Sequence, residues 1–218
     1  MKKHSKTIVL LSSILILLFC SFYALTDSGG PPSGNTNAPG DDNCTQCHYG
    51  TLVTTGSNWN NVSLSSNIPS TGYVPNTVYT MTLSHTQTGI SLFGFQLTVL
   101  NNTNNSKAGT IIITSPSTTQ IDTGTRDYLQ HTQSGTAGWG SIDWTFNWKA
   151  PNTNVGDVVF YAIVNASDNN NSSAGDMIIA KNFTHHASSL LPDAFITLSD
   201  STVSVDDTVF LSGRATKI

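Results

Sequence analysis

Several short stretches of the chain alternate between apolar and polar residues, which is the pattern of half-buried β-strands. The clearest stretch covers residues 141–151, where Ile142, Trp144, Phe146 and Trp148 alternate with polar side chains. Other β-like runs cover residues 77–85, 93–100, 109–115, 157–167 and 176–186. No segment keeps a helical period. Short strands separated by loops of Gly, Asn and Ser predict an all-β sandwich over residues 51–190, with the aromatic stripe of 141–151 in its core.

The two ends of the chain differ from this central region. Residues 1–26 run from the basic stretch MKKHSK through an apolar run to small polar residues, which predicts a secretory signal peptide. The apolar run is also near the length that spans a bilayer, so a retained membrane anchor is the alternative. Residues 27–50 are rich in Gly, Pro and Asn and predict an extended arm. Residues 191–218 predict a C-terminal β segment, with runs at 202–205 and 208–211 that could form a hairpin and open an Ig-like module.

Charge and polar composition narrow the class of protein. The chain has nine basic residues and thirteen acidic residues, and all the acidic ones are Asp. Lys2, Lys3 and Lys6 would leave with the signal peptide, so six basic residues would face thirteen acidic ones, a formal charge of −7. No nucleic-acid partner is expected, because phosphates require a basic surface. The abundant Asn, Thr, Ser and Gly suit the turns and strand faces of an exported β protein.

Both cysteines that follow residue 26 lie in one motif, Cys44-Thr45-Gln46-Cys47-His48. This is the C-x-x-C-H pattern of covalent haem attachment. Two thiols at this spacing can form thioethers with the two vinyl groups of one porphyrin, and the imidazole of His48 can then bind the iron. The motif predicts one covalent haem c, bound by Cys44, Cys47 and His48. Such attachment follows export, which agrees with a signal peptide.

Three other interpretations of this motif stay open. Cys44 and Cys47 could form a small disulfide in an oxidising compartment. A thioredoxin-like redox pair would require a βαβ setting, whereas the surrounding sequence predicts loop and strand. A zinc site would require about four ligands, and the chain has no second cysteine pair.

A second axial ligand for the iron would have to come from elsewhere in the chain. The candidates are His85, His131, His185, His186, Met81 and Met177. Met81 falls on the apolar side of its predicted strand, so we expect it in the core. Spacing alone does not choose among the histidines.

Six segments, taken in order, resemble one family: PPSGNTNAPGDDNCTQCHYG, GYVPNTVYTMTL, FGFQLTVL, RDYLQHT, WTFNWKAP and GDVVFYAIVNA. From about residue 31 to residue 179 the chain resembles the bacterial choice-of-anchor V domain, a relative of the reelin N-terminal (Reeler) domain. The resemblance implies an Ig-like, Reeler-like β-sandwich on an exported or cell-surface protein, with a haem motif near the mature N-terminus. It also implies a histidine at position 131, so we expect His131 as the distal metal ligand opposite His48.

Two functions from different classes follow from these observations. The first is an exported monohaem c-type cytochrome-like protein, in electron transfer or haem-based redox chemistry or sensing at the cell envelope, with a redox protein as partner. The second is an extracellular adhesive or binding module with a cell-surface or matrix partner, in which the cysteines form a disulfide or the haem is only structural. No catalytic motif stands out, so no enzyme is expected. Both functions place the protein in the periplasm, on the cell surface or outside the cell, with membrane contact only through an uncleaved signal peptide.

Overall fold

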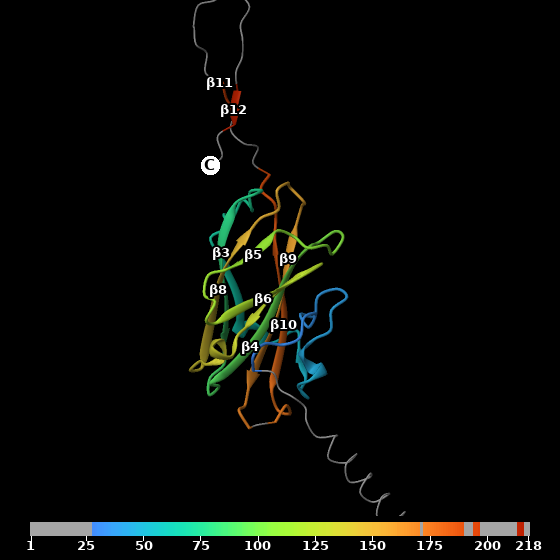
Figure 1. Cartoon of the computed structure of the whole chain (residues 1–218), viewed down its shortest axis with the longest axis vertical. Helices are drawn as coiled ribbons and strands as arrows, with labels where there is room; N and C mark the ends of the chain where they lie inside the picture. Colours follow the sequence, from blue (N-terminus) through green and yellow to red (C-terminus); the bar gives the residue numbers. More distant parts are fainter. Residues whose placement is uncertain (1–27, 171, 190–193, 197–212, 216–218) are drawn as a thin grey trace, which may run out of the picture.

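Two β-sheets pack face to face in the computed structural model of the chain, which describes residues 28–170, 172–189, 194–196 and 213–215 (Figure 1). The larger sheet has the strand order β1-β10-β9-β4-β7-β6, and the smaller one has the order β2-β3-β8-β5. Neighbouring strands within both sheets are antiparallel, except that β1 runs parallel to β10. The predicted all-β sandwich is confirmed. The predicted signal peptide lies outside the described residues.

The strands agree with the alternation in the sequence. The six predicted runs are β3 (Val78–Thr86), β4 (Leu92–Asn101), β5 (Thr110–Ile113), β8 (Ser141–Lys149), β9 (Val158–Ser167) and β10 (Met177–His185). Four more strands, which alternation does not predict, are β1 (Leu52–Val53), β2 (Val62–Ser66), β6 (Thr119–Thr123) and β7 (Asp127–His131). These four are short, and most of them are rich in polar residues, so they carry little periodic signal. The two-sheet body also has three 3-10 turns: η1 (Cys44–Gln46), η2 (Asn58–Asn61) and η3 (Gln133–Thr136).

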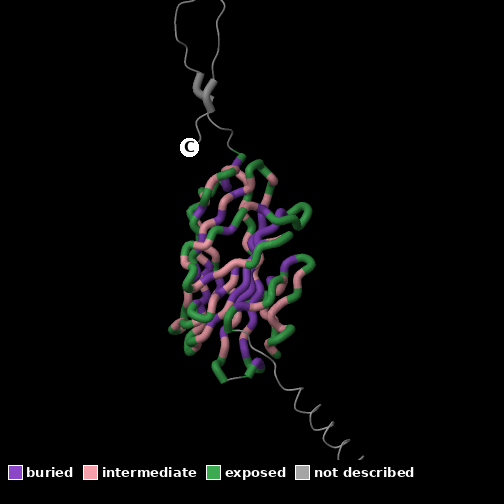
Figure 2. Tube along the Cα trace, in the orientation of Figure 1, coloured by how far each residue is buried: buried purple, intermediate pink, exposed green. Residues whose placement is uncertain are grey.

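The core lies between the two sheets and contains the predicted aromatic stripe. Trp144, Phe146 and Trp148 of β8 are buried there, and so is Met81 of β3, as predicted. The indole N–H groups of Trp144 and Trp148 donate to backbone carbonyl groups at 2.8 Å and 3.0 Å, so both buried nitrogen atoms have a hydrogen-bond partner. Figure 2 shows the buried residues running through the middle of the body, with exposed residues on the loops around it.

The outer face of the larger sheet is covered as well, by residues that precede β1. Gln96 of β4 is fully buried although it lies on this face, and its side chain accepts a hydrogen bond from the Asn35 amide at 2.7 Å. The same side chain donates to the Pro32 carbonyl at 2.9 Å. Arg126 pairs with Asp41 at 2.6 Å. The segment predicted as an extended arm is therefore docked on the sheet across residues 28–43, and Figure 1 shows it in blue beside β10.

The C-terminal part is described over two short segments only. Ala194–Ile196 (β11) and Gly213–Ala215 (β12) pair as antiparallel strands. The runs 202–205 and 208–211, for which a hairpin is predicted, lie outside the described residues. Within the described part of the chain, no helix is long and apolar enough to cross a membrane.

Candidate functional site

A cavity of about 420 Å³ lies on the outer face of the larger sheet. Its lining comes from the docked N-terminal segment, from β4 and β9, from the end of β7 and from the loop that leads into β10. Four of its lining residues are the sequence-predicted ones, Cys44, Cys47, His48 and His131. The fold thus brings His131 to the C-x-x-C-H motif, although more than eighty residues separate them in the chain.

The motif itself folds as one tight turn. Asn43 caps η1 by accepting a hydrogen bond from the Thr45 amide at 3.0 Å, and the His48 amide donates to the Cys44 carbonyl at 2.9 Å. Both cysteines of this turn line the same cavity, as attachment to one ligand requires. Cys44 and Cys47 are both free thiols.

The electrostatics of Cys44 argue against a thioredoxin-like pair. Burial raises the pKa of the Cys44 thiol to about 12, and the neighbouring Cys47 adds to the rise. Reactive cysteines of redox enzymes have lowered pKa values, because the thiolate is the attacking species. Cys44 is thus held as a thiol at neutral pH, packed against the small apolar cluster of Ile163, Ile178 and Ala180.

His131 ends β7 and lies buried against β4. Its Nδ1 lies 3.0 Å from the Phe95 amide nitrogen and 3.1 Å from the Phe95 carbonyl oxygen, so the backbone of β4 fixes the position of the ring. Gly94 makes this approach possible, since a Cβ atom there would lie only 2.9 Å from His131 Cε1. The missing side chain at Gly94 leaves the space that the imidazole uses at this cavity wall.

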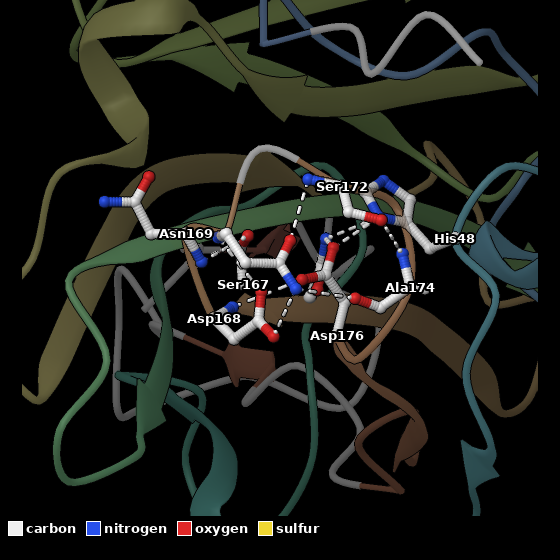
Figure 3. Close-up of polar contacts among 9 residues, drawn as sticks. His48, Ser167, Asp168, Asn169, Ser172, Ala174 and Asp176 are labelled. Carbon is white, nitrogen blue, oxygen red and sulfur yellow. Dashed lines mark hydrogen bonds and ion pairs between the residues drawn. The ribbon is translucent and has the colours of Figure 1, made fainter. Parts of the chain in front are cut away.

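His48 is held by residues of β9 and of the loop before β10. Its Nδ1 lies 2.5 Å from Asp176 Oδ2 and 3.2 Å from Asn165 Nδ2 (Figure 3). Asp176 is buried, with a side chain only 1% exposed. Sequence reasoning missed Asp176, Asn165 and Gly94. Each is a common loop or strand residue, and only the pairing of β4, β9 and β10 brings them to the motif.

The other candidates for an axial ligand do not line this cavity. Met81 and His85 lie between the sheets, and His186 is exposed, paired with Asp157 at 2.8 Å. Among the described residues, no group of three or more His, Cys, Asp or Glu side chains is arranged to hold a metal ion. The zinc interpretation therefore finds no ligand set in this part of the chain, whereas an iron supplied within a porphyrin would need only axial ligands from the protein.

Comparisons with known proteins give the family. No curated protein sequence matches the chain. Among solved structures, the human F-spondin reeler domain is 20% identical over 62% of this chain and 94% of its own, with a TM-score of 0.46. The Reelin-N domain of F-spondin is 21% identical over 62% and 90%, with a TM-score of 0.45. A cohesin module from a Clostridium perfringens family 33 glycoside hydrolase is 11% identical over 58% and 96%, with a TM-score of 0.39.

The family profile is the decisive comparison, because it spans more than half of the chain. The Reeler domain profile matches residues 44–170, which run from the first cysteine of the motif to the loop after β9. The matched stretch includes both cysteines, His48 and His131. The chain belongs to the Reeler domain family.

Proposed function

We propose that this protein is an exported binding module of the Reeler family, and that the cavity on its larger sheet is the binding site. The family match supports this reading better than it supports a cytochrome, because it points to a module fold and not to a redox reaction. A cavity of about 420 Å³ also falls within the range of ~300–1,000 Å³ that is usual for small-molecule sites. A cell-surface or matrix partner fits such a module.

The ligand that we propose for this cavity is one haem c. The observation that carries this proposal is that Cys44, Cys47, His48 and His131 all line one cavity. Cys44 and Cys47 would hold the porphyrin by thioethers, and His48 would be the proximal iron ligand. His131 would be a second iron ligand through Nε2, since its Nδ1 faces the backbone of Phe95. The missing side chain at Gly94 supports the fit, because it lets the His131 ring lie at the cavity wall.

The residues around the cavity have separate roles in this proposal. The raised pKa of Cys44 keeps its sulfur as a thiol and so slows disulfide formation, which proceeds through a thiolate. Pro31, Pro32 and Asn35 of the docked segment line one side of the cavity. A bound haem would supply one-electron redox chemistry, and two histidine ligands would favour electron transfer over the binding of a gas or peroxide. In that case a redox protein, and not only a cell-surface or matrix partner, would bind the module.

A second candidate function shares the fold and the exported location. In it the module is adhesive, and Cys44 and Cys47 form a disulfide or hold a haem that is only structural. The family match is the observation that favours it. The two candidates differ in the state of the cysteines and in whether the iron changes oxidation state.

The decisive experiment is expression of the full chain in a host with a cytochrome c maturation system, followed by intact mass and visible spectroscopy. The haem proposal predicts the mass of the chain plus one haem and a reduced spectrum with Soret and α bands. A double Cys44→Ala, Cys47→Ala variant is the matched control and should be colourless. A colourless wild type two hydrogens lighter than the reduced chain would contradict the proposal and leave the disulfide form.

The role of His131 has its own test in the same preparation. Replacing His131 with Ala removes one axial ligand but leaves the thioether positions and His48 unchanged. The expected result is a change from a low-spin to a high-spin spectrum with the haem still attached. An unchanged spectrum would remove His131 from the proposed ligand set.

A further inference from the structure

Asp176 is a buried carboxylate that lies just before β10 and faces the C-x-x-C-H motif (Figure 3). Its Oδ2 contacts His48 Nδ1 at 2.5 Å and accepts from Asn165 Nδ2 at 3.2 Å, while its Oδ1 accepts from the Asp168 amide at 3.2 Å. Among the described residues, His48 is the one ion-pair partner that Asp176 has. A carboxylate in this position loses its hydration, so the hydrogen bonds from its neighbours must compensate.

The short distance indicates which nitrogen of His48 carries the proton. An Nδ1 without hydrogen would place its lone pair against a carboxylate oxygen at 2.5 Å, where the two would repel. We therefore assign the proton to Nδ1, which donates to the Asp176 carboxylate at Oδ2, while the Asn165 Nδ2 group, 3.2 Å from Nδ1, donates to the same Oδ2. In the neutral ring, the lone pair then resides on Nε2, which is the form of imidazole that binds a metal.

A second His–Asp pair in the same protein shows what is particular to this one. His186 and Asp157 lie 2.8 Å apart, but their side chains are 74% and 38% exposed. Water screens that pair and competes for its hydrogen bond. The His48 and Asp176 side chains are 21% and 1% exposed, so the field of this carboxylate acts on the ring with little screening.

We propose that Asp176 is a positioning residue that holds His48 as the Nδ1–H tautomer, directs Nε2 to the cofactor and makes the imidazole a stronger electron donor. The proposal deepens the proposed function and rests on it. A carboxylate hydrogen-bonded to an axial histidine stabilises the more positive ferric state over the ferrous state. Asp176 thereby lowers the midpoint potential of the bound haem and favours its oxidised form.

The first test needs no cofactor. The full chain is expressed without the maturation system, labelled with ¹⁵N-histidine and kept reduced. Long-range ¹H–¹⁵N spectra at neutral to mildly alkaline pH should show His48 as the Nδ1–H tautomer. The isosteric variant Asp176→Asn should shift His48 toward the Nε2–H tautomer, and Asp157→Asn should leave it unchanged. A wild-type His48 that is mainly Nε2–H overturns the proposal.

The second test uses the haem-loaded protein, and its order separates two kinds of failure. Intact mass first establishes whether wild type, Asp176→Asn and Asp157→Asn contain covalent haem, and redox titration then gives the midpoint potentials. We expect a higher potential for Asp176→Asn and an unchanged one for Asp157→Asn. Haem in all three with equal potentials overturns the role of Asp176 and leaves the proposed function standing. A wild type without haem overturns the proposed function and the potential-setting role together, and the tautomer result still decides the His48–Asp176 contact.

A conservative variant guards against a purely structural effect. Asp176→Glu keeps the negative charge, so its potential should lie closer to that of wild type than the potential of Asp176→Asn does. Circular dichroism shows whether Asp176→Asn folds. If it does not, the histidine spectra of Asp176→Glu and wild type still compare the tautomer of His48. An Asp176→Glu variant that folds but has His48 mainly as the Nε2–H tautomer would also contradict the proposal.

Discussion

The two faces of β4 are both buried, but they are buried in different ways. The inner face contributes large apolar side chains to the space between the sheets: Phe93, Phe95, Leu97 and Val99. The alternate positions include Gly94 and Gln96, which meet His131 and the docked N-terminal segment. Apolar packing is non-directional and gives stability, whereas hydrogen bonds and a missing side chain set distances and angles. The contrast indicates that the inner face holds the fold and the outer face positions the candidate site.

The largest loss of stability should come from a substitution on the inner face of β4. Leu97 is fully buried, so Leu97→Ala removes apolar contacts and leaves a cavity. We expect a loss of about 2–5 kcal/mol in the free energy of unfolding, measured by urea denaturation. Thr80→Ala, at an exposed position of β3, is the control and should change it by ~0.5 kcal/mol or less. A loss for Leu97→Ala as small as that of the control would show that the inner face does not hold the fold.

A pH effect should come from His85, which lies between the sheets. His85 is fully buried against Phe93, and neither ring nitrogen has a hydrogen-bond partner within the described part of the chain. Burial lowers the pKa of His85 from its ordinary 6.5 to about 4. Between these two values the unfolded chain binds the proton and the folded chain does not, so stability falls as the pH falls from about 6.5 to about 4. At about 1.4 kcal/mol for each pH unit, the loss amounts to about 3 kcal/mol.

The variant His85→Leu tests this pH effect. Without the imidazole, the unfolding free energy should depend less on pH between about 4 and 6.5, and it should be higher at the acid end of that range. Denaturation curves at several pH values measure it. Thr80→Ala is again the control, because Thr80 is exposed and has no titratable group, so the slope should stay unchanged. Burial also lowers the pKa of His185, so a smaller slope of the same sign should remain. Equal slopes in wild type and His85→Leu would contradict the assignment.

A smaller loss of stability, with a specific change at the site, is expected on the outer face of β4. In Gly94→Ala the new Cβ would lie 2.9 Å from His131 Cε1, so the ring must move. We expect a loss of about 1–3 kcal/mol in unfolding free energy and shifted His131 signals in histidine NMR spectra. Gly124→Ala is the matched control, since its Cβ would have its nearest neighbour at an ordinary 3.7 Å. An unmoved His131 in Gly94→Ala would show that the glycine does not shape this cavity wall.

The smallest effect should come from the contact that ties the N-terminal segment to the sheet. Arg126 pairs with Asp41 at 2.6 Å, and its side chain is 19% exposed. Asp41 is only 4% exposed, but Thr36 and Tyr128 still donate to its carboxylate, so Arg126→Gln should reduce the unfolding free energy by about 1–2 kcal/mol. It should also make residues 28–43 more accessible, measured as faster limited proteolysis in that segment than in wild type. Lys149→Gln serves as control, because Lys149 has no ion-pair partner among the described residues. Equal cleavage rates for all three proteins would contradict the role of Arg126 in docking the segment.

The fold could be predicted from the sequence because its strongest signal is local. Alternation in 141–151 and in 93–100 records which side chains face the core, and burial of Trp144, Trp148 and Leu97 bears this out. The short strands β6 and β7 escaped prediction because they contain mostly polar residues and are held by their neighbours in the sheet. The docking of residues 28–43 was not predicted for a related reason. Gly, Pro and Asn form no periodic pattern that would indicate a distant contact.

For the candidate site, the sequence by itself determined the chemistry of the motif and little of its surroundings. Cys44, Cys47 and His48 are neighbours in the chain, so their spacing alone predicts a common ligand. The resemblance to a known family pointed to His131, and the tertiary structure placed it in the same cavity. Only the tertiary structure decided that Gly94 gives His131 its space and that Asp176 binds Nδ1 of His48. The physical reason is that these contacts join residues far apart in the chain, and pairing of β4, β9 and β10 is what sets their distances.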